Sequence, residues 1–536
     1  YFMTKNYLTG SRLYALLPLL LCACTVQSQD LIWEKSYGGK HAEFLAHVVP
    51  TPDYGFLLAG SSLSDKNGNK QTPSGGNFDY WLWKMDEHGS PDWQKSFGGS
   101  GLDFLQSARI TADGGFILAG VSGSPKGGDK KEDSRGQDDY WIIKLDAKGN
   151  EQWQRTIGGS GQEQLACISP TKDGGYIVGG SSSSGKSGDK TEANQGNLDY
   201  WIVKLNASGT IEWQKTYGGR YMDQLKTVEQ TKDGGYILGG YSNSPASGDK
   251  QSDNIGTGDY WIIKTDKAGA IEWQRTLGGD GDDNLSALIQ SRNGGYVLGG
   301  SSNSNPSNDK SRANTKGTDF WIVRLDDDGQ TLWQETYNYG AVDLLTSIVE
   351  NEDGTLLLGG YAQTEVSDGK KDKKDINDYI AVKINAKGEE LWSKTVGSDG
   401  EDILNGLIET RDGGYLLAGT SKGKPSRDKS SGHGGNDFWV VKLKDRYKKE
   451  VEKPVIEALP NPAQNFTNIV VGYEFQSGTA SVFDLSGRQL QQFAIDSRTV
   501  PVDLSHYPEG IYIVEIRTNL QTDSVKVIKG INPVKN

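Results

Sequence analysis

Short segments rich in β-branched and aromatic residues recur between residues 31 and 445, and glycine or aspartate separates them. Apolar and polar positions alternate within these segments, which is the pattern of half-buried strands. One unit has such segments beginning at residues 213, 223, 235 and 259. Each unit therefore predicts four short strands.

A tryptophan marks the same position in every unit, at spacings of 60 residues five times and then 59. Seven copies of one unit predict a stacked or closed repeat architecture. Four strands in each of seven repeats match a seven-bladed β-propeller. We expect the marker tryptophans to pack between blades, where a large flat side chain fills the wedge. They are Trp33, Trp93, Trp153, Trp213, Trp273, Trp333 and Trp392.

The turns indicate which strands share a blade. Asp-Gly-Gly after the second segment and Asp-x-x-Gly before each tryptophan are hairpin signals. A blade then begins at the Asp-x-Leu segment and ends at the tryptophan segment. The last blade lacks its outer strand, whereas the first tryptophan segment, 32–35, has no blade before it. We expect this segment to pair with residues 440–443, so that no edge stays unpaired.

The composition fits an all-β chain and argues against binding to nucleic acid. The 71 glycines suit many tight turns, and a net charge of −13 disfavours contact with a phosphate backbone. We divide the chain into a signal peptide (1–28), a propeller (29–445), a charged linker (446–458) and a C-terminal domain (459–536). The last segment loses the repeat and predicts short strands of a small Ig-like β-sandwich.

The N-terminal segment predicts export. Residues 13–24 are apolar, follow a basic stretch and are too few to span a bilayer comfortably. Cleavage between Ser28 and Gln29 would leave no transmembrane span. The alternative is a lipoprotein signal that places a lipid on Cys24. After cleavage Cys167 is the one remaining cysteine, so no intrachain disulfide can form.

Polar pairs recur in the long loops between the third and fourth segments of a unit, which join the second and third strands of a blade. These loops should share a rim with the blade-to-blade connections, and binding usually resides in loops on a rigid scaffold. The pairs either dock an extracellular glycan or protein, or bond locally within each loop. They are Asp129-Lys130, Asp189-Lys190, Asp249-Lys250, Asp309-Lys310 and Asp428-Lys429.

A ring of acidic residues precedes the innermost strands. Carboxylate oxygens suit hard cations, so calcium at a channel mouth is one interpretation, and no other cofactor is expected. The alternative is that each carboxylate caps a glycine-rich turn by accepting backbone N–H groups. A further ring, from Asp79 to Asp437, is expected to be structural. The candidate metal ligands are Glu43, Asp103, Glu163, Asp223, Asp283, Asp343 and Asp402.

The sequence offers no asymmetric group of base, acid and stabiliser, which catalysis needs. The five histidines have no metal-ligand spacing, and no nucleophile elbow, phosphate loop or zinc motif occurs. Departures from the repeat gather in unit six. There Asn338-Tyr339 replaces the double glycine and Ile380 replaces a tryptophan, and the loop has lysines at 370, 371, 373 and 374.

The turn before each marker tryptophan, such as Asp146-x-x-Gly149 before Trp153, resembles the tryptophan-docking repeats of quinoprotein-like propellers. The resemblance supports a propeller fold. Quinoprotein dehydrogenases similar to this chain would have paired cysteines beside the cofactor, which Cys167 alone does not provide. A quinone-dependent activity is therefore not expected.

The C-terminal segment resembles the type A sorting domain of the Bacteroidota type IX secretion system. The matching motifs are Pro460-Asn-Pro462, Asp484-x-x-Gly487-Arg488, the strand 504–514 and the strand 526–529. The resemblance implies recognition by that secretion machinery through 459–536, passage across the outer membrane, removal of the domain, and release or surface attachment. Such cargo resembles substrates of signal peptidase I, which weakens the lipoprotein alternative.

We therefore expect a secreted or surface-attached propeller that binds an extracellular glycan or protein without catalysis. A secreted polysaccharide hydrolase or lyase is the main alternative. A scaffold within a larger surface assembly is a third.

Overall fold

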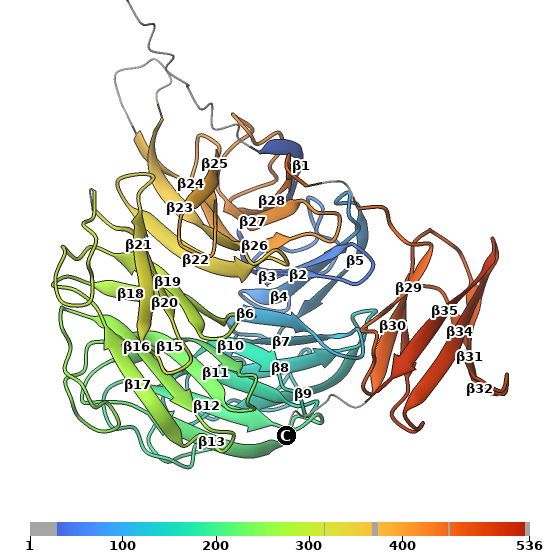
Figure 1. The fold of residues 1–536 in the computed structure, drawn as a ribbon, viewed down its shortest axis with the longest axis horizontal. Helices are drawn as coiled ribbons and strands as arrows, with labels where there is room; N and C mark the ends of the chain where they lie inside the picture. The colour runs from blue at the N-terminus through green and yellow to red at the C-terminus, as the bar shows by residue number, and fades with distance from the viewer. Residues whose placement is uncertain (1–28, 316, 367–373, 449–450, 531–536) are drawn as a thin grey trace, which may run out of the picture.

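The computed structural model describes residues 29–315, 317–366, 374–448 and 451–530. This part of the chain is all-β, and it contains no helix. Its strands form nine antiparallel sheets, of which seven have four strands each and come from the repeats (Figure 1). The repeated four-strand pattern predicted from the sequence is confirmed.

Six of the seven sheets run in simple chain order. The first two contain β2 (Glu43–Pro50), β3 (Phe56–Ser62), β4 (Asp79–Met85) and β5 (Pro91–Phe97), and then β6 (Asp103–Ile110), β7 (Phe116–Ser122), β8 (Asp139–Leu145) and β9 (Glu151–Ile157). The next two contain β10 (Glu163–Pro170), β11 (Tyr176–Ser182), β12 (Asp199–Leu205) and β13 (Ile211–Tyr217), and then β14 (Asp223–Gln230), β15 (Tyr236–Ser242), β16 (Asp259–Thr265) and β17 (Ile271–Leu277). The fifth and sixth contain β18 (Asp283–Gln290), β19 (Tyr296–Ser302), β20 (Asp319–Leu325) and β21 (Thr331–Tyr337), and then β22 (Asp343–Glu350), β23 (Leu356–Val366), β24 (Lys374–Ile384) and β25 (Glu390–Val396).

The seventh sheet joins the two ends of the repeat region. It consists of β26 (Asp402–Glu409), β27 (Tyr415–Ser421), β28 (Asp437–Lys444) and the N-terminal strand β1 (Asp30–Tyr37). Trp33 lies opposite Lys442, just as Trp273 lies opposite Lys264 inside the fourth sheet. The predicted pairing of the first tryptophan segment with the last strand is confirmed, although β1 extends beyond residues 32–35 at both ends.

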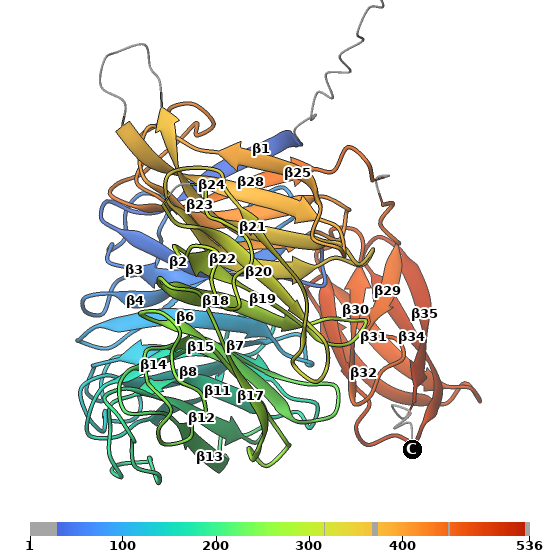
Figure 2. The same ribbon diagram turned by 60° about the vertical axis from the view of Figure 1, so that its left-hand side comes forward.

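Neighbouring sheets pack through aromatic pairs on their third strands. Tyr200 lies 4.9 Å from Trp261 between ring centroids, and its hydroxyl donates to the Trp261 carbonyl at 3.1 Å. Phe438 and Trp81 form the equivalent pair, with centroids 4.8 Å apart, between the seventh and first sheets. These two sheets share one hydrophobic cluster. The two views show the sheets side by side around the molecule (Figures 1 and 2).

The marker tryptophans lie on the outermost strands and contact the following sheet. Trp213 on β13 meets Tyr236 on β15 edge-on, with ring centroids 5.5 Å apart. Related contacts join Trp93 to Phe116, Trp153 to Tyr176, Trp273 to Tyr296 and Trp392 to Tyr415. Trp333 donates its indole N–H to the Ala386 carbonyl at 3.0 Å, and Trp33 packs against the cluster shared by the first and seventh sheets.

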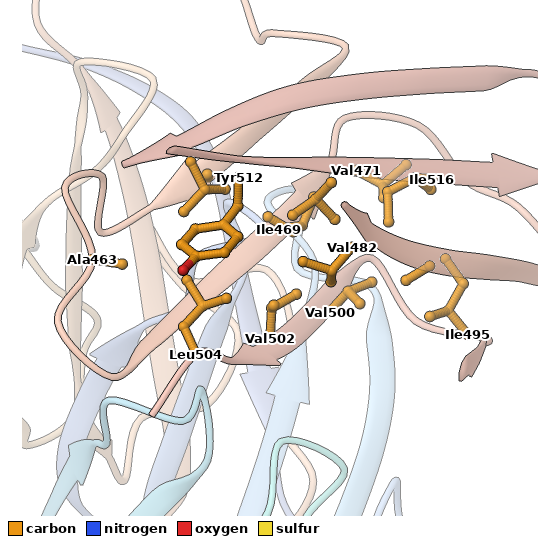
Figure 3. Packing of buried hydrophobic residues seen from close by; sticks show 14 residues of the cluster. Ala463, Ile469, Val471, Val482, Ile495, Val500, Val502, Leu504, Tyr512 and Ile516 are labelled. Carbon is orange, nitrogen blue, oxygen red and sulfur yellow. The ribbon is translucent and has the colours of Figure 1, made fainter. Parts of the chain in front are cut away.

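The C-terminal segment forms two facing sheets. One contains β29 (Ile456–Leu459), β30 (Phe466–Val471) and β33 (Thr499–Asp503), and the other contains β31 (Gly478–Asp484), β32 (Gln489–Ile495), β34 (Gly510–Thr518) and β35 (Thr522–Lys529). Ile469, Val482 and Val514 are fully buried between them (Figure 3). The first strand begins at Ile456, three residues before the boundary drawn from the sequence.

Ion pairs connect this segment to the repeat region. Arg411 pairs with Glu457 at 2.6 Å and Lys148 with Asp496 at 2.6 Å. Glu87 contacts Lys453, which precedes β29. A cavity of about 250 Å³ lies beside these contacts.

Candidate functional site

The long loops lie against the connections between sheets, as the sequence indicates. The backbone N–H of Asp249 donates to the Gly218 carbonyl at 2.8 Å, and the Asp249 carboxylate accepts the Gly218 N–H at 3.2 Å. The same carboxylate contact, at 3.0–3.2 Å, is made by Asp129, Asp189 and Asp428, whereas Asp309 donates its backbone N–H to Gly278 at 3.2 Å. These aspartates tie each loop to the sheet connection.

The lysines of the loop pairs are buried, with 1–2% of each residue exposed. The Lys250 ammonium donates to the carbonyls of Ser244 and Ser252 at 2.9 and 2.8 Å and to Asn254 at 3.1 Å. Equivalent bonds within the loops are made by Lys130, Lys190, Lys310 and Lys429. Lys70 belongs to the same set, but Asn69 precedes it, so the Asp-Lys motif misses it.

The acidic ring accepts backbone N–H groups from the sheet connections. Asp223 accepts the Gly219 N–H at 2.7 Å and the Ser244 hydroxyl at 3.0 Å. The corresponding N–H contacts of Glu43, Asp103, Glu163, Asp283, Asp343 and Asp402 span 2.6–3.0 Å. No three His, Cys, Asp or Glu side chains converge on a metal-sized site within the described ranges. Calcium binding stays a prediction, which thermal unfolding with and without millimolar calcium checks.

Each ring carboxylate lies beside a second buried carboxylate from the preceding sheet. A side chain at Gly278 would collide with Asp259 and Asp283 together, which explains why this position has no Cβ. Burial, with a smaller contribution from the neighbouring Asp223, raises the pKa of Asp199 to about 6. Burial likewise raises the pKa of Asp139, Asp259 and Asp343 to about 6.

These carboxyl groups make stability depend on pH in an unusual direction. Because their pKa is higher in the folded chain than in the unfolded chain, the folded state binds extra protons between about pH 4 and about pH 6. We therefore expect the melting temperature to fall as pH rises through this window and then to level off. Differential scanning fluorimetry across the window measures it. Asp199→Asn should flatten the slope, whereas Asp189→Asn in a loop should not, and a rising melting temperature would contradict the assignment.

Unit six departs from the repeat in the length of two strands and in the partner of one buried carboxylate. Its β23 and β24 have 11 residues each instead of seven. Arg427, from the loop of unit seven, forms a bidentate ion pair with Asp378 at 2.9 Å and so supplies a cation beside that carboxylate. Ile380 is buried. Lys370, Lys371 and Lys373 lie outside the described residues. Cys24 and Ser28, from the predicted signal segment, also lie outside them. Gln29 is described, and its side chain accepts the Arg446 backbone N–H at 3.1 Å.

A central cavity of about 380 Å³ is lined by the first strand of all seven sheets. Each of these strands has a β-bulge, which turns one extra side chain toward the cavity. The bulged residues are Ala46, Gln106, Ala166, Lys226, Ser286, Thr346 and Asn405. They comprise six residue types in seven sheets, unlike the repeated positions. The sequence analysis missed the cavity because it followed the residues that the units share.

The motifs of the C-terminal segment come together in space. The Asn461 amide donates to the Lys526 carbonyl at 2.8 Å and accepts the Ile528 N–H at 2.9 Å, so the Pro-Asn-Pro motif is fixed to β35. Lys529 donates to the carbonyls of Leu504 and Tyr507, each at 2.6 Å. Residues 457–530 match the family described as secretion system C-terminal sorting domain. This chain carries a type IX sorting domain. Such a domain implies contact with the type IX machinery and export to the medium or the cell surface.

Solved structures similar to the chain are low in sequence identity. The BBS1N structure in complex with ARL6DN has a TM-score of 0.42 and 10% identity and covers 79% of this chain and 98% of its own. Sqt1 from Chaetomium thermophilum has a TM-score of 0.38, 12% identity, and coverage of 79% and 99%. Puromycin hydrolase has a TM-score of 0.37, 12% identity, and coverage of 77% and 58%.

No curated protein matched the chain. Within the residues that the structure describes, no helix has the length and apolar character needed to cross a membrane.

Proposed function

We propose that the seven sheets are the blades of a closed propeller and that the mature protein is a non-catalytic binding module for an extracellular glycan or protein. The N-terminal segment would act as a signal peptide in a bacterium of the Bacteroidota. The two facing C-terminal sheets would be an Ig-like sandwich that is removed after export. The pairing of β1 with β28 and the cluster shared by the first and seventh sheets support closure.

The construction of the long-loop rim carries the binding proposal. In every unit except the sixth, the loop is fixed by a buried lysine, and in most of these units an aspartate also bonds to the sheet connection. A surface fixed in this way loses little conformational entropy when a partner binds, which favours affinity. Exposed polar residues such as Lys126 and Lys186 then project from an ordered face.

A glycan array and a product assay on the same glycans test this proposal. We expect the chain to retain at least one extracellular polysaccharide without releasing product. Lys126→Ala with Lys186→Ala should weaken binding by roughly fivefold or more, which is the usual cost of losing an interface contact. Lys267→Ala with Lys387→Ala, on the turns at the opposite end of the sheets, is the matched control. Product formation would favour the hydrolase or lyase alternative, and retention of an outer-membrane protein alone would favour a protein ligand.

A further inference from the structure

The wall of the central cavity is chemically divided. The strands β2, β6 and β14 contribute His47, Arg109, Lys226 and Glu229, whereas β18, β22 and β26 contribute mainly small and aliphatic residues. Nothing in the repeat requires charges at these positions, because the equivalent residues in the other sheets are neutral. The asymmetry therefore marks one side of the cavity for a purpose other than packing the sheets.

The two cations of this wall have no carboxylate within ion-pair distance among the described residues. Arg109 uses one nitrogen to donate to His47 Nε2 at 2.6 Å and to the Ala108 carbonyl at 3.0 Å. Burial lowers the pKa of His47, and the adjacent guanidinium lowers it further, so the ring stays neutral and can accept this bond. Lys226 makes no side-chain hydrogen bond to a described residue, and burial lowers its pKa. Unpaired cations in a partly desolvated cavity favour an anionic ligand.

The charges of the wall indicate how many negative charges the ligand has. Arg109 and Lys226 are the two basic side chains of this wall beside the neutral His47, and Glu229 is the one acid among the residues that line this cavity. Burial raises the pKa of Glu229, and Arg109 opposes that rise. By residue type, the lining of this cavity has two basic side chains against one acidic side chain. A ligand with a single carboxylate balances this lining, whereas a dianionic phosphate would bring one more negative charge than the lining can match.

The approach to the cavity is lined mainly with glutamine amides and also includes two carboxylates, both of which have partners within the protein. Asp138 accepts the Gln162 amide at 3.2 Å, and Glu163 accepts the Gly159 N–H and the Ser182 and Ser184 hydroxyls. A second cavity of about 420 Å³ shares Gln106, Ala166 and Lys226 with the first, so the two adjoin. Gln164 and Gln224 line it and are joined by a 3.3 Å hydrogen bond. Amide groups can donate to and accept from hydroxyls, which suits a polyhydroxylated ligand better than an aliphatic acid.

Aromatic rings hold the corresponding positions in the first two sheets. Phe44 and Phe104 take the place that Gln164 and Gln224 have in the third and fourth sheets. Together with Phe78 they form a group whose centroids are 5.6–6.2 Å apart, and all three rings are partly exposed. The linings of the two cavities do not include these rings, which could pack against the apolar face of a sugar that extends beyond the cavities. A sugar ring also fits the volume, because ligand cavities of about 300–1,000 Å³ are typical for small molecules.

We propose that the central cavity binds a monoanionic sugar acid, with its carboxylate held by Arg109 and Lys226 and its hydroxyls by the glutamines at the approach. This inference goes beyond the proposed function, because a free sugar acid can occupy the cavity whether or not the rim binds a polymer. It also explains why β6 and β14 present long cationic side chains where other first strands present short ones.

Isothermal titration of the full chain with D-glucuronate and with D-glucose tests the proposal. We expect glucuronate to bind and glucose to bind at least roughly tenfold more weakly, because the charge-assisted bonds are lost. Lys226→Gln should weaken glucuronate binding at least roughly tenfold and leave the melting temperature unchanged, since Lys226 has no structural bond. Lys267→Gln, on the turn between Asp266 and Gly269 at the end of the sheets opposite the rim, is the matched control and should bind as the unaltered chain does.

Arg109→Gln should give the same loss, but this variant also removes the bond to His47, so its melting temperature is needed beside its affinity. Equal binding of glucose and glucuronate, or glucuronate affinity unchanged in Lys226→Gln, overturns the proposal. So does the absence of glucuronate binding by a chain that melts normally.

Discussion

A chain that ends at residue 448 should accumulate in the periplasm and be lost almost completely from the medium and the cell surface. The sorting domain at 457–530 is the part of the chain that the secretion machinery reads, and a targeting signal of this kind acts as an address independent of the cargo. Cell fractionation with an antibody against the repeat region measures the distribution.

The retained protein must still be folded for this result to bear on sorting. The repeat region has its own clusters and its own closing strand, so the truncated chain should keep a single melting transition. Lys453→Ala is the matched control, because it removes a contact between the two parts and leaves the sorting domain intact. Normal appearance of the truncated chain outside the cell would refute the sorting role.

Trp81→Ala should destabilise the repeat region by about 3–5 kcal/mol, which is the usual cost of truncating a fully buried tryptophan. Trp261→Ala should cost a similar amount. The two residues occupy equivalent positions, both are fully buried, and their aromatic partners lie at 4.8 and 4.9 Å. Trp81 contacts the seventh sheet, whereas Trp261 contacts the third. In addition, Phe438 has no hydroxyl to donate as Tyr200 does, and Trp81 packs against Trp83.

The comparison distinguishes a closed ring from an open array. In an open array the end sheets fray, and a residue between the first and last sheets contributes less than one in the middle. Equal losses in chemical denaturation therefore support closure. A loss for Trp81→Ala that is much smaller than for Trp261→Ala would contradict it.

Much of the repeat region could be predicted because its signals are local and repeated. The Asp-x-x-Gly turn before Trp273 fixes that strand as the partner of residues 260–265. Six copies of this turn, four with aspartate and two with asparagine at the first position, leave little ambiguity. The extension of β23 and β24 could not be predicted in this way, since the loop of unit six lost the shared motif.

The role of the polar residues was harder to predict. Lysines are seldom fully buried, so composition favours an exposed Lys250, yet its loop folds around the ammonium and supplies three acceptors. The charged wall of the cavity posed the opposite problem. Arg109 and Lys226 lie 117 positions apart by their numbers, and only the arrangement of the sheets brings them to one space.

The register of the β1–β28 pair has a consequence for how such genes can change. Trp33 lies opposite Lys442 as Trp273 lies opposite Lys264. The sheet that joins the two ends of the repeat region therefore pairs its third and fourth strands in the same register as a sheet formed within the chain. Recombination that adds or deletes one whole repeat would therefore leave the pairing between the N-terminal strand and the last repeat unchanged. By the same reasoning, new chain ends placed in any of the Asp-x-x-Gly turns should yield a circularly permuted protein that still folds.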